Sequence, residues 1–326
     1  MTAAVPSKSH GIWQIAAFYQ FQPVDDPQGM VDHLVAEMTR IQQRQPAQGA
    51  TLLGTVLVAG EGINGTIAGS STAIEEAFAL LHGVGFQQLM RRNTRSEKAP
   101  FHRLKVRLKR EIVSMGQALD ENSETGQYVE PEQWDQLISR ADVVVVDTRN
   151  RYETDLGSFA GAIAPDTDSF RDFPTWSETH LNKVAQPKVA MFCTGGIRCE
   201  KATAYLKSQG FEEVFHLRGG ILNYLERVPQ DQSSWQGECF VFDDRVTVNH
   251  QLEAGTHQQC FNCRMPLTEL DLIDQRYEQH VSCPQCFDRV DEKRRSSLLE
   301  RARQITLARE RGQSHLGAKM PVEDQS

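Results

Sequence analysis

The sequence has no uninterrupted apolar run as long as a membrane-spanning helix, which needs about 20 residues. Its first residues, MTAAVPSKSHGIWQ, also lack the apolar segment of a secretory signal peptide. These two absences predict a cytoplasmic protein that does not bind a membrane. In that compartment we do not expect the seven cysteines to form a disulfide framework, so metal binding or thiol chemistry is the better expectation.

An overall positive charge is also absent, because 43 Asp and Glu outweigh 35 Lys and Arg. The formal net charge of −8 excludes a uniformly basic nucleic-acid binder but not a local patch. One basic stretch lies between Met90 and Glu111, where Glu97 and Glu111 are the only acids. Its basic residues are Arg91, Arg92, Arg95, Lys98, Arg103, Lys105, Arg107, Lys109 and Arg110. We interpret this stretch as a polyanion-binding surface in which Phe101 can stack on a base, the alternative being a solvated strand face. A second basic stretch, 289–311, is diluted by acids.

The apolar pattern predicts three folded units. Residues 10–115 alternate between strand and helix periods, which predicts a ferredoxin-like or acylphosphatase-like α+β sandwich. Its second helix, 71–82, is predicted to begin with a capping box of Thr72 and Glu75. After a polar linker, apolar strands at 141–149, 187–193 and 213–220 alternate with helices such as 200–210, which predicts a parallel sheet covered on both faces. The predicted boundaries are 1–115 for the first domain, 116–127 for the linker, 128–232 for the α/β domain, 233–290 for a cysteine-rich unit and 291–326 for a charged helical tail.

The stretch GEGING at 60–65 matches the G-x-G-x-x-G pattern of dinucleotide-binding loops. The residues that follow it predict a strand and a turn rather than a helix, and no acid stands about 20 positions later. We therefore interpret this stretch as a hairpin turn, and we expect neither NAD nor flavin as a cofactor.

The stretch CTGGIRCE begins at Cys193, directly after an apolar strand and before a helix. Backbone amides, the helix N-terminus and the charge of Arg198 would all lower the pKa of the Cys193 thiol and make it a nucleophile. The alternative is an inert buried cysteine, which is common at strand ends. Six residues later, Cys199 is either a resolving thiol for an oxidised Cys193 or a packing residue. Asp147 and Arg149, at the end of another strand, either orient the loop or only pair with each other.

Two Cys-x2-Cys pairs follow near the C-terminus. Their spacing is typical of a structural zinc site with four thiolate ligands, and an iron–sulfur centre is the second interpretation. The four predicted ligands are Cys260, Cys263, Cys283 and Cys286. We expect the zinc to stabilise a unit that has few core residues of its own.

The central part of the chain resembles a rhodanese domain. The segments that carry the resemblance are DTR at 147–149 with Glu153, GSFAGAI at 157–163, CTGGIR at 193–198 and LRGGILNY at 217–224. The resemblance implies that the loop cysteine can carry a persulfide. The spacing Cys-x4-Arg is one residue shorter than the Cys-x5-Arg loop of related phosphatases and favours sulfur over phosphate. The candidate site residues are Cys193, Thr194, Gly195, Gly196, Arg198, Cys199 and Asp147.

The chain as a whole resembles the bacterial rhodanese-like tRNA uridine-34 hydroxylases. The resemblance rests on GEGING, FHRLKVRLKREIVSMG at 101–116, DLGSFAGAI, FRDFP at 170–174, CTGGIRCEKA and the paired Cys-x2-Cys. It implies an oxygen-dependent conversion of the wobble uridine of tRNA to 5-hydroxyuridine, with molecular oxygen as co-substrate and Cys193 essential. The basic stretch would then hold the anticodon stem-loop through Arg91, Arg92, Arg95, Lys98, Phe101, Arg103 and Lys105.

Two mechanisms are compatible with this resemblance. In one, the Cys193 thiolate adds to C6 of the uracil ring and makes C5 electron-rich. In the other, an oxidised or persulfide sulfur on Cys193 delivers or activates the oxygen. Two other classes of function remain open at this point, namely a sulfurtransferase that carries a Cys193 persulfide and a non-catalytic RNA-binding module.

Overall fold

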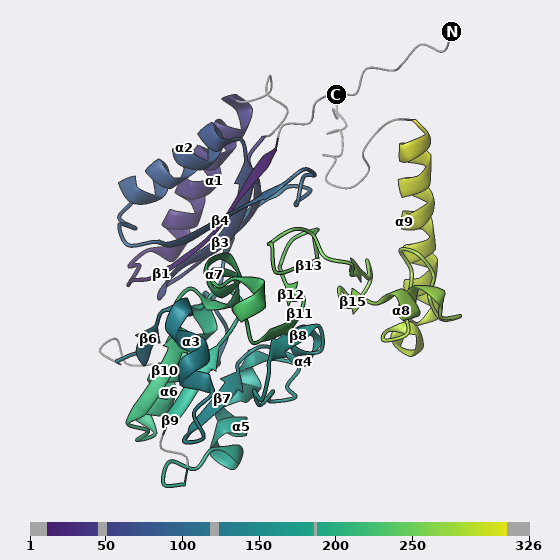
Figure 1. The fold of residues 1–326 in the computed structure, drawn as a ribbon. Coiled ribbons are helices and arrows are strands. Elements are labelled where there is room, and N and C mark those ends of the chain that lie inside the picture. The colour runs from purple at the N-terminus through teal and green to yellow at the C-terminus, as the bar shows by residue number, and fades with distance from the viewer. Residues whose placement is uncertain (1–11, 45–50, 118–123, 186–187, 312–326) are drawn as a thin grey trace. The chain divides into compact units, whose positions relative to one another are not determined.

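The structure is a computed structural model that describes residues 12–44, 51–117, 124–185 and 188–311 (Figure 1). The chain divides into two compact units. The first unit comprises the chain up to Asp243 together with Thr247–Gly255, and the second comprises Asp244–Val246 and the chain from Thr256.

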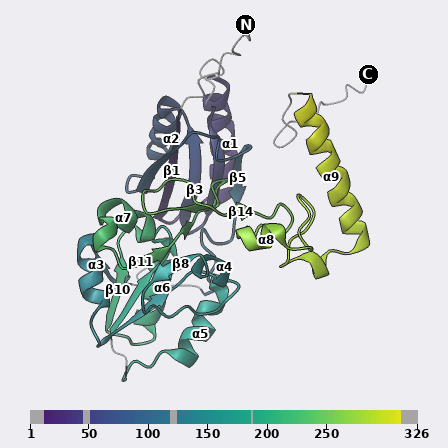
Figure 2. The same cartoon turned by 45° about the vertical axis from the view of Figure 1, so that its right-hand side comes forward.

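The first unit begins with an α+β domain, as the sequence predicts. Its five strands are arranged in the order β4-β1-β3-β2-β5, and helices α1 and α2 cover one face of the sheet (Figures 1 and 2). The sheet is antiparallel apart from the pairing of β5 with β2. The elements are β1 (Trp13–Phe21), α1 (Pro27–Arg44), β2 (Leu53–Ala59), β3 (Gly62–Gly69), α2 (Ser71–Gly83), β4 (Met90–Ser96) and β5 (Leu104–Leu108).

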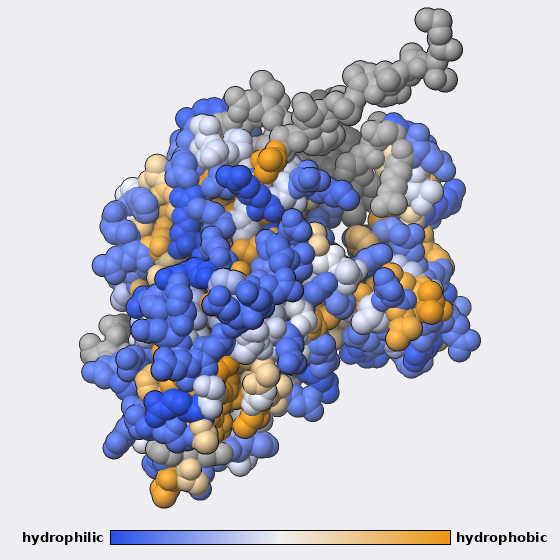
Figure 3. Space-filling view, in the orientation of Figure 1, coloured by the Kyte–Doolittle hydropathy of each residue, from blue (hydrophilic) through white to orange (hydrophobic). Residues whose placement is uncertain are grey.

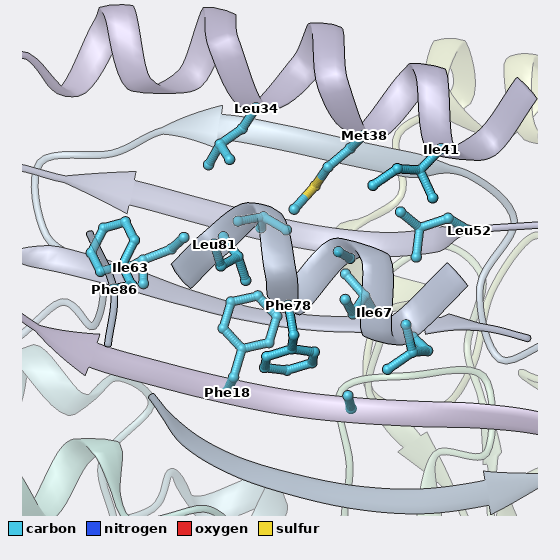
Figure 4. Close-up of a cluster of buried hydrophobic side chains, with 14 of the residues drawn as sticks. Phe18, Leu34, Met38, Ile41, Leu52, Ile63, Ile67, Phe78, Leu81 and Phe86 are labelled. Carbon is cyan, nitrogen blue, oxygen red and sulfur yellow. The ribbon is translucent and has the colours of Figure 1, made fainter. Parts of the chain in front are cut away.

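The core of this domain forms where the apolar stripe of α1 meets the sheet. Leu34, Met38 and Ile41 recur at helical spacing and are buried, and Figure 4 shows them directed toward the strands. Phe18 of β1 packs edge-on against Phe78 of α2 with ring centroids 5.4 Å apart. Burial of these side chains on both layers stabilises the sandwich.

Two local predictions in this domain are tested by the structure. The GEGING stretch is a hairpin turn, as predicted, because Ala59 of β2 pairs directly with Gly62 of β3. The predicted cap of α2 is wrong by two residues. Ser70, not Thr72, is the N-cap, and its side chain accepts a hydrogen bond from the backbone N–H of Ala73. The structure also contains β4, which the sequence analysis treated only as charged residues.

The second domain of the first unit contains the predicted parallel sheet, with strand order β6-β10-β9-β7. Apolar clusters lie on both faces of this sheet. Its strands and helices are β6 (Gln127–Val129), α3 (Pro131–Ile138), β7 (Val143–Asp147), α4 (Arg151–Thr154), β8 (Gly157–Phe159), α5 (Phe173–His180), β9 (Lys188–Phe192), α6 (Ile197–Ser208), β10 (Glu213–Leu217) and α7 (Gly220–Arg227). Short 3₁₀ turns cover Phe170–Asp172 and Gln230–Gln232.

Residues beyond 232 also belong to this unit, which differs from the predicted boundary. Strand β11 (Trp235–Gly237) pairs with β8, and Trp235 packs edge-on against Phe159 with ring centroids 5.2 Å apart. Strands β12 (Cys239–Phe240) and β13 (Thr247–Val248) pair with each other. The apolar residues of this segment therefore complete the core of the α/β domain.

The second unit consists of short elements and one long helix. Strands β14 (Gln258–Gln259) and β15 (Pro266–Leu267) pair, and they are followed by α8 (Glu269–Ile273), a 3₁₀ turn at Phe287–Arg289 and α9 (Glu292–Glu310). None of the helices within the described residues combines the length and the apolar character needed to cross a bilayer. Hydrophilic side chains make up most of the molecular face drawn in Figure 3.

Candidate active site

Cys193 lies directly beyond the last residue of β9, at the carboxyl end of the parallel sheet. Val189, Met191 and Cys193 belong to one apolar cluster, while Ala190 and Phe192 belong to the other. This alternation is the period of a strand buried on both faces. The neighbouring strand β7 ends at Asp147, so both predicted residues occupy the edge where parallel sheets carry their chemistry. Cys193 is only 1% exposed.

Two glycines give the Cys193 loop its shape. Gly196 has a φ of 97° and is the N-cap of α6, and its backbone N–H donates a hydrogen bond to the Cys193 sulfur at 3.1 Å. This left-handed N-cap explains why α6 begins at Ile197 rather than at the predicted Glu200. Gly220 has a φ of 67°, and a Cβ there would lie 2.4 Å from the carbonyl oxygen of Cys193. Only glycine fits at this position.

The first turn of α7 also binds the Cys193 loop. The backbone N–H of Ile221 donates to the Cys193 carbonyl at 2.9 Å, and that of Leu222 donates to the Thr194 carbonyl at 3.1 Å. The sequence analysis used the LRGG stretch only as part of the rhodanese resemblance and did not assign it this role.

The surroundings of Cys193 favour a thiolate. Burial opposes ionisation, but a hydrogen bond with the Cys199 thiol, the charge of Arg198 and the backbone amides of Cys199 and Arg198 together lower the pKa of Cys193 below its ordinary range. Burial and the neighbouring Cys193 thiolate raise the pKa of Cys199. Cys199 therefore remains a neutral thiol that donates to the Cys193 sulfur. The hydroxyl oxygen of Thr148 lies 3.6 Å from the Cys199 sulfur.

Arg198 is held in place by Glu153, a residue that the sequence analysis did not include among the candidate site residues. The two side chains form two hydrogen bonds, with Nη2 2.8 Å from Oε2 and Nη1 3.2 Å from Oε1. The Thr194 hydroxyl also donates to Glu153, at 3.3 Å. The Glu153 side chain is fully buried, and a buried carboxylate is stable only with a positively charged partner, which Arg198 provides. The sequence signal that could have identified Glu153 as a site residue was its position within the segments that resemble a rhodanese domain.

Asp147 and Arg149 pair with each other, which was one of the two predicted alternatives. The Arg149 Nε and Nη2 atoms lie 2.9 Å and 2.6 Å from the two Asp147 carboxylate oxygens, and both side chains are fully buried. The Ser158 hydroxyl also donates to Asp147, and Arg149 donates to the Gly157 carbonyl. These contacts join the end of β7 to β8.

Residues of the α+β domain contact two buried side chains in the first turns of α6, Glu200 and Lys201, which the sequence analysis did not identify. Glu200 accepts hydrogen bonds from the Tyr19 hydroxyl at 2.9 Å and from the Tyr128 hydroxyl at 2.8 Å. Burial raises the pKa of Glu200, although both hydroxyls oppose this shift. The adjacent Lys201 lies 2.7 Å from carboxylate oxygens of Glu61 and Glu111. The helix that follows the reactive loop is thus bonded to the first domain.

The predicted basic stretch is not a single strip in the folded protein. Strands β4 and β5 form opposite edges of the sheet, which separates Arg91, Arg92 and Arg95 from Lys105. Arg91 stacks on the Phe78 ring at 3.8 Å and pairs with Glu75.

Of the other residues in the stretch, some contact the rest of the fold and some are exposed. Arg92 pairs with Glu226 of α7. Phe101 is half-buried and packs against the small apolar cluster of Trp13, Ile15 and Ala68. Arg95, Lys98 and Arg103 are exposed, whereas Lys105 is half-buried.

The second unit brings the two Cys-x2-Cys pairs together. The sulfur atoms of Cys260, Cys263, Cys283 and Cys286 all lie within 4.8 Å of one another, and all four cysteines are free. The sulfurs of Cys260 and Cys286 are 3.9 Å apart, those of Cys263 and Cys283 3.6 Å, and those of Cys283 and Cys286 3.7 Å. These separations fit a tetrahedron with metal–sulfur bonds of about 2.3 Å, so the four thiols can hold a metal ion.

Comparisons with known proteins identify both domains of the first unit. Residues 13–112 match the family described as "UPF0176 acylphosphatase like domain", and residues 130–227 match the rhodanese-like domain family. The chain has the domain architecture of the UPF0176 family. In this chain the rhodanese-like domain carries Cys193, and its α6 is bonded to the acylphosphatase-like domain through Glu200 and Lys201. The rhodanese-like domain supports a sulfurtransferase or a related catalytic function.

Several solved structures resemble part of this chain. The rhodanese-like domain of the Anabaena protein Alr3790 is 20% identical, with 35% of this chain and 80% of that chain covered and a TM-score of 0.29. The rhodanese homologue TT1651 of Thermus thermophilus is 25% identical, with 29% and 96% covered and a TM-score of 0.23. A Rhodopseudomonas palustris protein described as a possible tyrosine phosphatase is 19% identical, with 30% and 79% covered and a TM-score of 0.26. TM-scores in this range support no statement about function.

Proposed function

We propose that this protein is a tRNA-modifying enzyme that hydroxylates the wobble uridine to 5-hydroxyuridine with Cys193 as its nucleophile. The observation that carries the proposal is the geometry of the loop: the Gly196 N–H donates to the Cys193 sulfur at 3.1 Å, and the loop's cation, Arg198, which lowers the pKa of Cys193, is fixed by a buried carboxylate. Such a thiol is ionised at neutral pH and can attack an electrophilic carbon. The domain architecture and the resemblance to tRNA uridine-34 hydroxylases support tRNA as the proposed substrate.

The Cys193 thiolate would add to C6 of the uracil ring and leave C5 electron-rich. The Arg198 guanidinium, already paired with Glu153, and the loop amides would stabilise negative charge that develops at the sulfur and the ring. Expulsion of the sulfur after the oxygen is attached and the C5 proton is removed would regenerate the free enzyme. An oxidised or persulfide form of Cys193 is the alternative route.

The oxygen atom sets a further requirement. Hydroxylation by molecular oxygen places one oxygen atom on C5 and releases the other as water, which consumes two electrons and two protons. A reductant, such as a cellular thiol, must therefore take part. A tRNA substrate and a free reactive thiol both fit the cytoplasm.

RNA binding would use the exposed basic residues of the acylphosphatase-like domain, of which Arg95, Lys98 and Arg103 are examples. The target uridine must leave the base stack of the anticodon loop before a protein thiol can reach its C6 atom. In the second unit we propose a structural zinc ion held by Cys260, Cys263, Cys283 and Cys286. A metal with all four positions filled by thiolates stabilises the unit and takes no part in the reaction.

Mass spectrometry of tRNA nucleosides tests this proposal. Unmodified tRNA is incubated with the protein and a thiol reductant, in air and under argon, and the nucleosides are separated. We expect a uridine that has gained one oxygen atom only in air, at the wobble position, and none with Cys193→Ser. Product formation by the Cys193→Ser protein would contradict both routes.

A persulfide-carrying sulfurtransferase is the second candidate. It is supported by the rhodanese-like domain and by the loop amide that binds the Cys193 sulfur at 3.1 Å. Rapid transfer of sulfur from thiosulfate to cyanide without tRNA, together with no hydroxylated nucleoside in air, would favour this function. A protein that binds tRNA equally well without Cys193 and yields neither product would be an RNA-binding module.

A further inference from the structure

An exposed aromatic ring, that of Phe242, lies beside the Cys193 loop. Phe242, two residues beyond β12, is 58% exposed, although it stands in a segment whose other apolar residues are buried. Single exposed apolar side chains are common on protein surfaces, so exposure alone does not indicate a function. The contacts of Phe242 are informative, because they fix the orientation of its ring and connect it to Arg198 in the candidate active site.

The Phe242 ring is braced from behind by other aromatic rings. It packs edge-on against Phe240 with centroids 5.1 Å apart, and Phe240 in turn packs edge-on against Tyr152 at 5.2 Å. Phe240 is only 3% exposed. Tyr152 precedes Glu153 in α4, so the row of three rings begins next to the carboxylate that holds Arg198. A ring held by such contacts loses little entropy when a ligand stacks on it.

The other neighbour of Phe242 is Arg198 itself. The central carbon of the Arg198 guanidinium lies 5.7 Å from the centroid of the Phe242 ring, within the range of a cation–π contact. Arg198 is also the residue that ends the Cys193 loop motif and adds its charge to the thiol's surroundings. An exposed ring is thus separated from the reactive loop by one side chain.

A flat exposed ring at this place suits a flat ligand. A uridine that leaves the base stack loses its stacking contacts with the neighbouring bases. Proteins replace those contacts by stacking an aromatic side chain on the base. Within the described part of the first unit, Phe242 is the one aromatic residue among the large exposed hydrophobic side chains.

We propose that Phe242 is the stacking platform for the pyrimidine ring on which Cys193 acts. This inference rests on the proposed function, because it assigns Phe242 to the substrate of that same site. It identifies a binding residue outside the rhodanese-like match, which ends at residue 227.

Kinetics with four variants test the role of the ring. Phe242→Ala removes it, Phe242→Leu keeps an apolar side chain without a π face, Phe242→Tyr keeps the ring, and Val184→Ala alters an 86% exposed apolar residue elsewhere in the domain. We expect Ala and Leu to raise KM for tRNA at least about fivefold, the size of a lost stacking contact, with Tyr and the Val184 variant unchanged. The rate of Cys193 alkylation by iodoacetamide should stay the same in all four. Equal KM values for Leu and wild type would overturn the proposal.

A binding experiment keeps this test separate from the test of the hydroxylase. In Phe242→Trp the exposed indole reports directly on stacking, and its fluorescence is measured with the wild-type spectrum subtracted. An anticodon stem-loop RNA with uridine at the wobble position should quench it, and the same RNA without a base at that position should not. Quenching without any hydroxylated product would leave the stacking platform intact and refute the proposed reaction. Equal quenching by both RNAs would refute the stacking platform.

Discussion

The ammonium group of Lys201 forms a 2.7 Å ion pair with Glu61, the acidic residue of the GEGING turn. The same nitrogen lies 2.7 Å from a carboxylate oxygen of Glu111, and only 5% of the Lys201 side chain is exposed. The turn that resembles a nucleotide-binding motif in the sequence therefore supplies a carboxylate to the helix that follows the reactive loop. Glu61 also accepts a hydrogen bond from the backbone N–H of Ile112, which fixes the orientation of its carboxylate.

Replacing Lys201 with Met should destabilise the first unit. The change leaves Glu61 and Glu111 close together without their cation, and both carboxylates are partly shielded from water. We expect a loss of about 2 kcal/mol in the free energy of unfolding, measured by urea titration. The matched control is Lys207→Met, because Lys207 pairs with the largely exposed Glu124 and its replacement should cost much less. Equal losses in the two variants would contradict the importance of the Lys201 cluster.

Replacing Tyr19 with Phe should destabilise the protein in a pH-dependent manner. Burial raises the folded-state pKa of Glu200, so stability falls as the pH rises from the unfolded-state pKa through the folded-state pKa. The Tyr19 hydroxyl opposes this shift, and its removal raises the folded-state pKa further. We expect a loss of about 1–2 kcal/mol near neutral pH and a smaller loss at pH about 4, near the unfolded-state pKa of Glu.

The control for this effect is Tyr205→Phe. The Tyr205 hydroxyl donates to Glu178 at 2.8 Å, but Glu178 is exposed. Removing the Tyr205 hydroxyl should therefore cost little stability at either pH, because water can replace it at the exposed carboxylate. Urea titrations of both variants at the two pH values provide the comparison, and a pH-independent loss for Tyr19→Phe would argue against a charged Glu200.

Removal of metal should unfold the second unit selectively. The four thiols of Cys260, Cys263, Cys283 and Cys286 converge, and this unit contains few buried apolar residues besides them. We expect zinc near one equivalent by elemental analysis, and its loss in Cys260→Ser together with increased proteolysis of the chain beyond Thr256. Cys239→Ala, at a buried cysteine in the first unit, should keep the zinc. A metal-free protein that resists proteolysis there would refute the site.

Periodicity predicted the elements whose side chains alternate between core and solvent. The helix periods predicted within residues 10–115 include α1, where Leu34, Met38 and Ile41 recur at helical spacing, and β9 was predicted because its apolar run fills both faces of the sheet. Strand β4, with the sequence MRRNTRS, shows no such alternation, and its pairing with β1 defines it instead. Strands β4 and β5 follow each other in the sequence, but they lie at opposite edges of the sheet.

The candidate site was predictable only where its residues are neighbours in the chain. Cys193, Arg198 and Cys199 lie on one loop and one helix turn, so their spacing together with the rhodanese resemblance indicated thiol chemistry. The partners that orient them are distant in sequence, since Tyr19 and Glu200 are separated by 181 positions. Glu153 illustrates the same limit, because a carboxylate becomes a site residue only when the fold places it against the arginine.

The pH dependence of Cys193 reactivity tests whether Cys199 acts as a hydrogen-bond donor to the thiolate or as a resolving thiol. The pKa of Cys193 is lowered, so alkylation by iodoacetamide should already be fast at pH values below about 8.5, where an ordinary thiol is mostly protonated. Cys199→Ala removes a hydrogen-bond donor to the thiolate and should move the midpoint of the rate upward by about one pH unit, whereas Cys199→Ser keeps a donor and should move it less. Arg198→Met removes a positive charge and should move the midpoint in the same direction as Cys199→Ala.

The measurement is the pH profile of the alkylated peptide that contains Cys193, quantified by mass spectrometry. If Cys199→Ala and Cys199→Ser leave the midpoint at the wild-type pH but both abolish recovery of activity after peroxide treatment and reduction, Cys199 acts as a resolving thiol rather than as a donor.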